Sequence, residues 1–376
     1  MAGRGYIILL LAVCAGVVRL SAADMQPPAS PTSVDEELLL PNWPAMAVPV
    51  INYTPETGWE FGGAAQAYIK LFSPRTSVIQ IGGAYSLNRQ WYVNAQGTLY
   101  FGTVLPWLLQ FRAGFRNYPD TYYGTGAEPN KSGTYARNGT PYDSQRGYAF
   151  VQPLVHVGRS WYIGPHAEYL WERTRMQGDD KAVTIQMPGI GVTAQFDSRD
   201  EVYYPHKGLM LKVSVTHYNR WWRSTCGLTA GQIDFRQYLP IGKQVVWCYQ
   251  VRAAIAASLT PGEIPFQMLP TFGGQDLVRG IPYGMFRDNT MVGLQTELRF
   301  PIWRWIRACA FVGAGDVYDY THWQWSRPKI GYGLGLRLTI NRAKINIRAD
   351  VARNNIYPSW GDIKGYGFYL TATEAF

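Results

Sequence analysis

Residues that could do enzyme chemistry are sparse in this chain. Its five histidines stand at positions 156, 166, 206, 217 and 322, without the spacing of metal ligands. The chain has no His-Glu-x-x-His, no Gly-x-Ser-x-Gly and no Gly-x-x-x-x-Gly-Lys motif. His156, Ser160 and His166 are close in sequence, but they span two predicted strands and a turn. The sequence therefore predicts no catalytic residue, no metal site and no cofactor.

Arg279 offers a different kind of chemistry, because it stands alone between Val278 and Gly280. It belongs to a stretch of about 30 residues that is rich in Gly and Pro and has no helical period, and a loop of this length is usually functional or disordered. Residues 292–300 then alternate between apolar and polar, which predicts a strand with Glu297 on its polar face. An arginine buried away from water needs a partner, since an unpaired buried charge is costly.

The composition favours many alternating strands. The chain has 376 residues, of which 16% are charged and 15% aromatic, and it contains 39 glycines. The formal charge is +9, but the basic residues are dispersed, without the interleaved aromatic residues of a nucleic-acid track. Cys14 lies near the N-terminus, and the other three cysteines are an odd number that argues against a disulfide framework. We therefore predict a protein that binds no nucleic acid.

The N-terminus predicts export. Arg4 precedes an apolar run over residues 6–18, and Ser21-Ala22-Ala23 is a small-residue cleavage site, so residues 1–23 are predicted as a signal peptide. Residues 24–45 are rich in Pro and Ser and are predicted as a flexible leader. No later stretch offers the roughly 18 apolar residues of a transmembrane helix.

Residues 46–376 are predicted to form about 16 strands of an antiparallel, all-β, transmembrane β-barrel. Alternation alone does not distinguish a barrel in lipid from a soluble sandwich, because both give the same pattern. The signal peptide, aromatic pairs such as Trp161-Tyr162 near strand ends and a terminal aromatic strand ending in Phe376 favour the membrane. The stretch 119–145 is predicted as a polar loop.

Several motifs resemble those of the BamA/TamA outer-membrane assembly superfamily. They are Val278-Arg279-Gly280 with its preceding Gly273-Gly274, the first strand and turn over Val48–Gly58, and Asp197-Ser198-Arg199-Asp200 followed by Pro205-His206-Lys207-Gly208. The resemblance covers almost all of the chain after the leader. Relatives often carry periplasmic POTRA domains before the barrel, and the roughly 20 residues of the leader are too few for a domain. The sequence thus resembles a short form without them.

The resemblance implies that the long loop, between the eleventh and twelfth strands, folds back into the barrel. Arg279 and Gly280 would then be anchored on the inner wall, with Glu297 as the first candidate carboxylate and Asp316 as the second. Two departures are visible: Ile281 stands where relatives have an aromatic residue, with Tyr283 as the candidate substitute, and Gly313 stands where relatives often have Asp. The resemblance also implies a periplasmic turn pinned by Asp197, Arg199 and Asp200.

The first and last strands form the seam of such a barrel. Pro49 lacks a backbone donor, so the first strand is expected to pair weakly where it meets the last one. The seam residues are Pro49, Ile51, Leu370 and Phe376. In the superfamily a weak seam acts as a lateral gate for substrate strands.

The resemblance implies a protein of the outer membrane of a Gram-negative bacterium that assembles, inserts or translocates surface components without catalysis. The implied partners are outer-membrane lipid, with lipopolysaccharide, nascent outer-membrane proteins and other assembly subunits as further candidates. Two alternatives stay open: a passive pore, and a structural accessory subunit of a larger outer-membrane complex.

Overall fold

The computed structural model describes sixteen stretches of the chain. They are residues 7–9, 45–54, 58–69, 77–87, 89–102, 106–127, 139–158, 160–200, 204–242, 244–258, 264–274, 276–303, 306–320, 328–339, 346–356 and 365–371. Apart from residues 7–9 and Ala45, the predicted signal peptide and leader lie outside these stretches, and so does Phe376.

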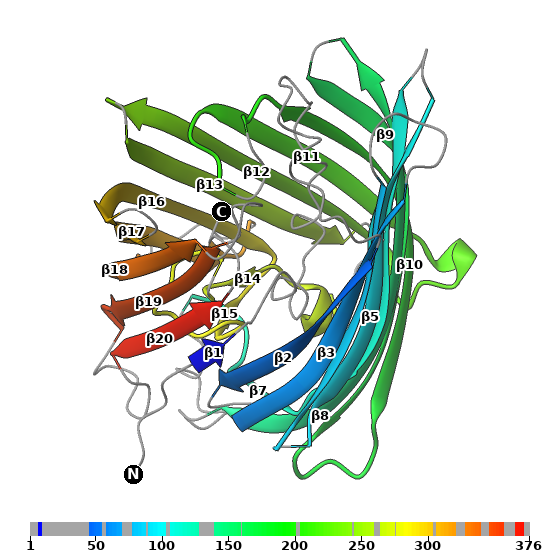
Figure 1. Cartoon of the computed structure of the whole chain (residues 1–376). Coiled ribbons are helices and arrows are strands. Elements are labelled where there is room, and N and C mark those ends of the chain that lie inside the picture. The colour runs from blue at the N-terminus through cyan, green and yellow to red at the C-terminus, as the bar shows by residue number, and fades with distance from the viewer. Residues whose placement is uncertain are drawn as a thin grey trace.

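Sixteen long strands form one antiparallel sheet that curves around an interior (Figure 1). Their bounds are β2 Ala45–Thr54, β3 Gly58–Ile69, β4 Ser77–Ser86, β5 Trp91–Phe101, β6 Trp107–Asn117, β8 Thr140–Val157, β9 Trp161–Met176, β10 Val183–Asp197, β11 Gly208–Tyr218, β12 Leu228–Ile241, β13 Val245–Ser258, β16 Thr290–Trp303, β17 Ile306–Tyr318, β18 Lys329–Thr339, β19 Asn346–Asn354 and β20 Tyr366–Thr371. Each pairs with the next along the chain from β2 to β20, and the short β7 Asp120–Tyr122 adds to β8. The predicted all-β architecture is confirmed.

The polarity of the sheet is inverted relative to a soluble protein. On β18, Leu334 is 67% exposed and Leu336 is 46% exposed, whereas Arg337, the residue after Leu336, is fully buried. On β16, Leu294 and Leu298 are exposed and Glu297 is fully buried. Because side chains alternate between the faces of a strand, every strand of this kind presents an apolar outer face and a polar inner one.

This alternation also corrects one detail of the predicted aromatic belts. Trp161 is 40% exposed on the outer face, but its neighbour Tyr162 is buried inside. Adjacent residues on a strand point to opposite faces, so an aromatic pair within a strand places only one ring on the outside.

The predicted polar loop over residues 119–145 is partly wrong. Residues 120–122 form β7, and β8 already begins at Thr140. The polar start of β8 pairs with β9 from Tyr142 onward, and Arg146 forms an ion pair with Glu172 of β9 at 2.6 Å. Cross-strand pairing therefore extends the strand where the sequence shows no apolar alternation.

The sequence predicts that the first and last strands of the barrel pair directly, but in the structure a further short strand lies at this boundary between β2 and β20. Ile7–Leu9 form β1, which pairs antiparallel with Ile51–Tyr53 of β2 and lies beside β20. The registers described here contain no pair between β2 and β20. Cleavage after residue 23, which would remove β1, stays a prediction.

Residues 264–274 and 276–289, between β13 and β16, lie inside the curved sheet, where Figure 1 shows the two-residue strands β14 Thr271–Phe272 and β15 Phe286–Arg287. They supply most of an apolar cluster in the interior. That cluster consists of Phe272, Leu277, Val278, Ile281, Met285, Phe286, Met291, Val317 and Ile356. The segment thus packs as part of the core, which positions Arg279.

Candidate functional site: a loop anchored on the inner wall

The guanidinium group of Arg279 lies between two carboxylates of the inner wall. Its Nη2 is 2.5 Å from Oε2 of Glu297 on β16, and its Nη1 is 2.7 Å from Oδ2 of Asp350 on β19. All three side chains are fully buried. Arg279 therefore joins two strands that are separated in the sheet by β17 and β18.

Three further arginines surround these two carboxylates. Arg337 of β18 contacts both, with its Nη1 2.5 Å from Oδ1 of Asp350 and its Nη2 3.3 Å from Oε2 of Glu297. The Nε of Arg299 donates to Oε1 of Glu297 at 2.8 Å. The Nε of Arg348 lies 3.4 Å from Oδ2 of Asp350. We call these six residues, Arg279, Glu297, Arg299, Arg337, Arg348 and Asp350, the anchor cluster.

Aromatic and backbone contacts complete the seat of the loop tip. The guanidinium carbon of Arg279 lies 3.5 Å from the ring centre of Phe311 on β17, which is a cation–π arrangement. The amide of Gly280 donates to the hydroxyl of Tyr369 at 2.8 Å, and the side-chain amide of Asn354 donates to the carbonyl of Gly280 at 2.8 Å. The tip is thus held by β19 and β20 as well as by β16.

The backbone at the tip is strained. Val278 has a φ of 42°, which is unusual for a β-branched residue, and Gly280 has a φ of 100° that favours glycine. Such conformations cost about 1–3 kcal/mol for a residue with a side chain and persist where the surroundings impose them. The contacts around Arg279 are the structural reason for this conformation.

Glycines on the wall make room for the loop. A Cβ on Gly331 of β18 would fall on the carbonyl oxygen of Arg279, and one on Gly315 of β17 would fall on the Phe272 ring. A Cβ on Gly313 would come within 3.1 Å of the Val278 side chain. The absence of side chains at these three glycines therefore lets Phe272, Val278 and Arg279 pack directly against the wall.

The structure confirms only some of the contacts that the sequence predicted for the anchor. It brings Arg279 and Gly280 together with Glu297, but Asp316 pairs with Lys329 at 2.5 Å instead of with Arg279. Ile281 is buried in the apolar cluster, whereas Tyr283 is 46% exposed. Tyr283 therefore does not take an inner aromatic position.

Sequence reasoning missed Asp350 as a partner of Arg279. Its signal was the alternation of β19, where Arg348 and Asp350 fall on the polar face. That pattern puts Asp350 on the polar face of its strand, which is the inner face of a barrel in lipid. It does not show that Asp350 stands beside Arg279, which depends on the register of β18 against β19 and on where the loop enters.

The turn between β10 and β11 is pinned by a second buried pair. Arg199 donates two hydrogen bonds to Asp197, from Nε at 2.9 Å and from Nη2 at 2.7 Å. Asp200 instead accepts from the amides of His206 and Lys207. Burial disfavours the charge of Arg199, but Asp197 outweighs this effect and raises the pKa of Arg199.

The same turn reaches the anchor cluster through Tyr204. The guanidinium carbon of Arg299 lies 5.2 Å from the ring centre of Tyr204, and that of Arg307 lies 4.5 Å from it. Arg299 in turn holds Glu297. Contacts from Tyr204 to Arg299 and from Arg299 to Glu297 therefore connect the turn with the loop tip.

The predicted seam residues lie on different strands. Pro49 of β2 is opposite Gly63 of β3, and Ile51 is flanked by β1 and β3. Leu370 of β20 pairs with β19. The fourth predicted residue, Phe376, is outside the described stretches.

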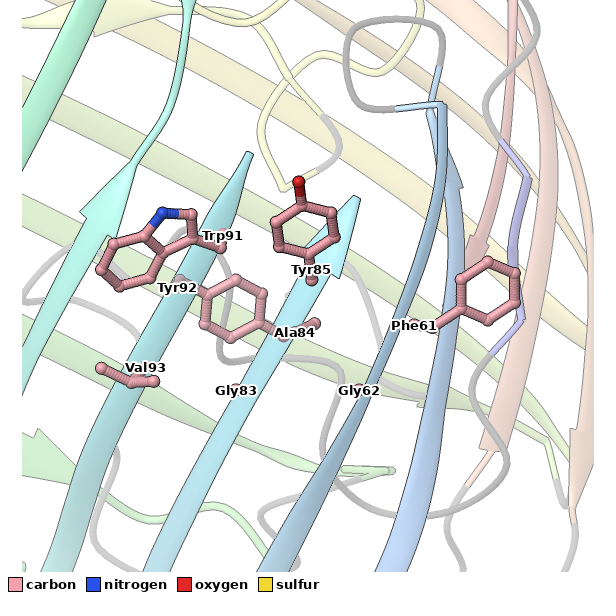
Figure 2. Close-up of a pocket in the computed structure, with 8 residues that line it drawn as sticks. All are labelled: Phe61, Gly62, Gly83, Ala84, Tyr85, Trp91, Tyr92 and Val93. Carbon is pink, nitrogen blue, oxygen red and sulfur yellow. The ribbon is translucent and has the colours of Figure 1, made fainter. Parts of the chain in front are cut away.

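A shallow groove of about 540 Å³ lies on the outer face of β3, β4 and β5 (Figure 2). Phe61, Tyr85 and Trp91 lie side by side in one register row across these strands and are exposed. Figure 2 shows Gly83 on the middle strand, next to Val93 on β5. This row of rings is of the kind that lines the edge of a bilayer.

The described stretches offer no other obvious chemistry. Among them, no group of three His, Cys, Asp or Glu residues could hold a metal ion, and no helix is both long and apolar enough to cross a membrane. Within the described stretches, Cys226, Cys248 and Cys309 form no disulfide.

Fold and site together define a β-barrel with a polar interior and a long loop fixed to its inner wall. The chain belongs to the Omp85 superfamily, whose domain model matches residues 52–376. This confirms the resemblance that the sequence motifs suggested. A comparison with curated proteins finds no match.

Solved structures share the fold. The chain is similar to BamA from Haemophilus ducreyi lacking POTRA domains 1–3, with 15% identity and a TM-score of 0.63 over 86% of this chain and 69% of that one. It is similar to CdiB from Escherichia coli, with 13% identity and a TM-score of 0.62 over 88% of this chain and 62% of that one. CdiB from Acinetobacter baumannii gives 15% identity and a TM-score of 0.53 over 86% and 58%. This chain therefore spans less than two thirds of either CdiB chain.

Proposed function

We propose that this chain is an outer-membrane β-barrel of a Gram-negative bacterium that assembles, inserts or translocates outer-membrane or surface components. Its place in the Omp85 superfamily and the likeness of its fold to BamA and CdiB support this proposal. Its partners would be outer-membrane lipid, including lipopolysaccharide, and nascent outer-membrane proteins or other assembly subunits. The protein would act without catalysis.

The observation that carries the proposal is the unequal pairing of β2. On one side β2 pairs with β3 over all of Ala45–Thr54, but on the other side the described part of the chain shows pairing only between Ile51–Tyr53 and β1. Pro49 has no amide hydrogen to add to the weaker side. A strand edge with unused backbone groups is the kind of surface to which another strand can add.

The anchor cluster would serve this role by keeping the loop inside while the seam opens. The loop tip is fixed to β16, β17, β18, β19 and β20, which form the wall next to the seam. We propose that this fixed wall guides the incoming strand. A mobile loop would obstruct the same space.

A reversible lock of the seam tests the proposal. The seam lock is the pair Ile51→Cys and Leu370→Cys, in a background without Cys226, Cys248 and Cys309. It would be oxidised in mature protein, from which the predicted cleavage after residue 23 has removed β1 from beside Ile51. The control lock is Ile233→Cys with Ala253→Cys, which are opposite each other within β12 and β13. The readout is insertion of an unfolded small outer-membrane barrel protein into vesicles that contain this protein.

We expect the seam lock to abolish insertion, reduction to restore it, and the control lock to leave it unchanged. Full insertion by the locked protein would exclude gating at the seam. The intact mass of the same preparation shows whether the chain begins at Asp24, as the predicted cleavage site requires.

A passive pore is the competing function, and the polar inner wall favours it. Fully buried inner residues include the neutral side chains of Gln110, Gln152 and Gln195. A pore would give a large, steady conductance in planar-bilayer recordings. An assembly protein with its loop packed inside is expected to give small or intermittent currents.

A further inference from the structure

A belt of aromatic rings runs across the outer face from β3 to β9. Phe61, Tyr85 and Trp91 stand in one register row on β3, β4 and β5. The ring of Phe115 on β6 stacks against Trp91, with 5.5 Å between ring centres, and against Trp171 of β9, with 6.1 Å. Aromatic side chains of a membrane barrel gather at the height where lipid headgroups meet acyl chains, so this belt marks one edge of the bilayer.

The belt reaches β10 at a change of polarity. Trp171 is opposite Gln186 of β10 in the register of the sheet. On the outer face of β10, Thr184 and Gln186 are exposed and polar, whereas Ile190 and Val192 are exposed and apolar. The outer surface of β10 therefore passes from lipid to headgroups between Gln186 and Ile190.

The loop between β11 and β12 attaches to β10 at this height. β10 extends beyond its pairing with β11, and the loop uses the backbone groups of that open edge. The indole of Trp222 and the hydroxyl of Ser224 donate to the carbonyl of Pro188 at 2.9 and 2.7 Å. The amide of Thr225 donates to the carbonyl of Gln186 at 2.8 Å. The loop is thus fixed to the wall at the edge of the bilayer.

This fixed loop presents one indole ring to the outside. Its short 3-10 helix, Arg220–Trp222, lies outside the wall beside β10 (Figure 1). The ring of Trp222 packs edge-on against His217, which is on the same outward face of β11 as Val215, with 5.7 Å between ring centres. Trp221 is 92% exposed, more than any other large apolar side chain in the described stretches. A rigid support therefore holds an indole where it touches nothing of its own chain.

Exposed arginines stand around this indole. Arg220 and Arg223 flank the tryptophan pair, and Arg223 keeps a φ of 70°, which is unusual without glycine. On the other side of β10, Arg173 of β9 is exposed one outward position beyond Trp171. None of these three arginines forms an ion pair with a described residue. Positive charge is thus available on both sides of β10 at the height of the headgroups.

We propose that the exposed indole and arginines of this loop bind an outer-leaflet lipid whose headgroup carries phosphate groups. Arg173 would add a contact from β9. The inference rests on the proposed outer-membrane barrel, in which the turn between β10 and β11 is periplasmic and the opposite end of β11 faces the cell surface. A guanidinium group matches two oxygens of a phosphate, and an indole is stable between headgroups and acyl chains. Two arginines on one loop therefore suit a headgroup with more than one phosphate.

Native mass spectrometry of the detergent-solubilised protein tests the site, because it counts the lipid molecules that each chain retains. The protein would be supplied with bisphosphorylated lipid A, and in parallel with the same lipid after removal of its phosphates. We expect one phosphorylated lipid per chain and about tenfold less retention of the dephosphorylated lipid. The readout needs no insertion activity, so it stays decisive even if the seam lock shows that the proposed gating is wrong.

Variants assign the retained lipid to the loop. Arg220→Gln with Arg223→Gln removes two charges at exposed positions and should lower retention of the phosphorylated lipid about tenfold. Lys207→Gln with Arg353→Gln removes the same charge from exposed positions elsewhere and should leave retention unchanged. Trp221→Ser should lower retention without disturbing the fold, because the indole is almost fully exposed. The proposal is overturned if the wild-type protein retains both lipids equally, or if the two double variants retain the same amount; the exposed indole would then be left to a protein partner.

Discussion

At the scale of the residue, one side chain connects the loop with the wall. Arg279 is fully removed from water, and it is stable there because Glu297, Asp350 and the Phe311 ring surround it. Buried ion pairs of this kind add little net stability compared with apolar packing, but removing one partner leaves an uncompensated charge. The cluster therefore fixes the position of the loop more than it stabilises the fold.

Replacing Arg279 by Ala should free the loop. The change leaves Glu297 and Asp350 with the other arginines only, and it should lower the free energy of unfolding by about 3–5 kcal/mol. Limited proteolysis in membranes should then cut within residues 276–288, which the wild-type protein protects. The matched control is Arg353→Ala, an exposed arginine on β19. Unchanged protection of the loop in the Arg279 variant would refute the anchor.

Gly331 tests the same seat without removing a charge. A Cβ at this position would overlap the carbonyl oxygen of Arg279, so Gly331→Ala should displace the loop and reproduce its proteolytic cleavage. Gly147→Ala is the control, because its Cβ would meet Phe115 at an ordinary distance of 3.5 Å. Equal protection in both variants would mean that the loop does not depend on this close approach.

Part of this site can be predicted from the sequence and part cannot. Glu297 is on the strand that follows the loop, so local alternation and the Arg-Gly motif together suggest the pair. Asp350 is 71 residues from Arg279, and only the strand registers bring the two together. Asp316 illustrates the limit: it is near Arg279 in sequence, but it lies between the inward-facing residues Gly315 and Val317 of β17 and forms an ion pair with Lys329.

At the scale of the element, the turn between β10 and β11 depends on a pair two residues apart. Asp197 and Arg199 are both buried, and Gly208 closes the turn with a φ of 103°, where a Cβ would overlap the Ser198 carbonyl. The motif could be predicted because the hydrogen bonds of the Asp197 and Asp200 carboxylates are all made within the turn. The polar start of β8 could not be predicted from the sequence, because this part of the strand forms through its pairing with β9.

Asp197→Ala should destabilise the barrel through this turn. It leaves the buried Arg199 without its carboxylate, so the free energy of unfolding should fall by about 3–5 kcal/mol. Urea titration in detergent micelles, followed by tryptophan fluorescence, measures the loss. Asp180→Ala, in the exposed turn between β9 and β10, should change little. A loss below about 1 kcal/mol for Asp197→Ala would show that the turn does not need the pair.

At the scale of the whole molecule, the faces of the sheet are reversed relative to a soluble sandwich. Alternation in the sequence gives the two faces of each strand but not which face is inside. The structure decides this, since Val215 of β11 is 49% exposed while Lys212 and Thr216 are buried. The apolar outer surface is explained if lipid surrounds the barrel.

Two adjacent substitutions on β11 test this reversed polarity most directly. Val215→Arg puts a charge on the outer face, and Ser214→Arg puts the same charge on the inner one. The measurement is the free energy of unfolding of each variant in phospholipid vesicles. A barrel in lipid should lose up to about 2–4 kcal/mol with Val215→Arg and much less with Ser214→Arg. The opposite order, with Val215→Arg harmless and Ser214→Arg strongly destabilising, would contradict the account.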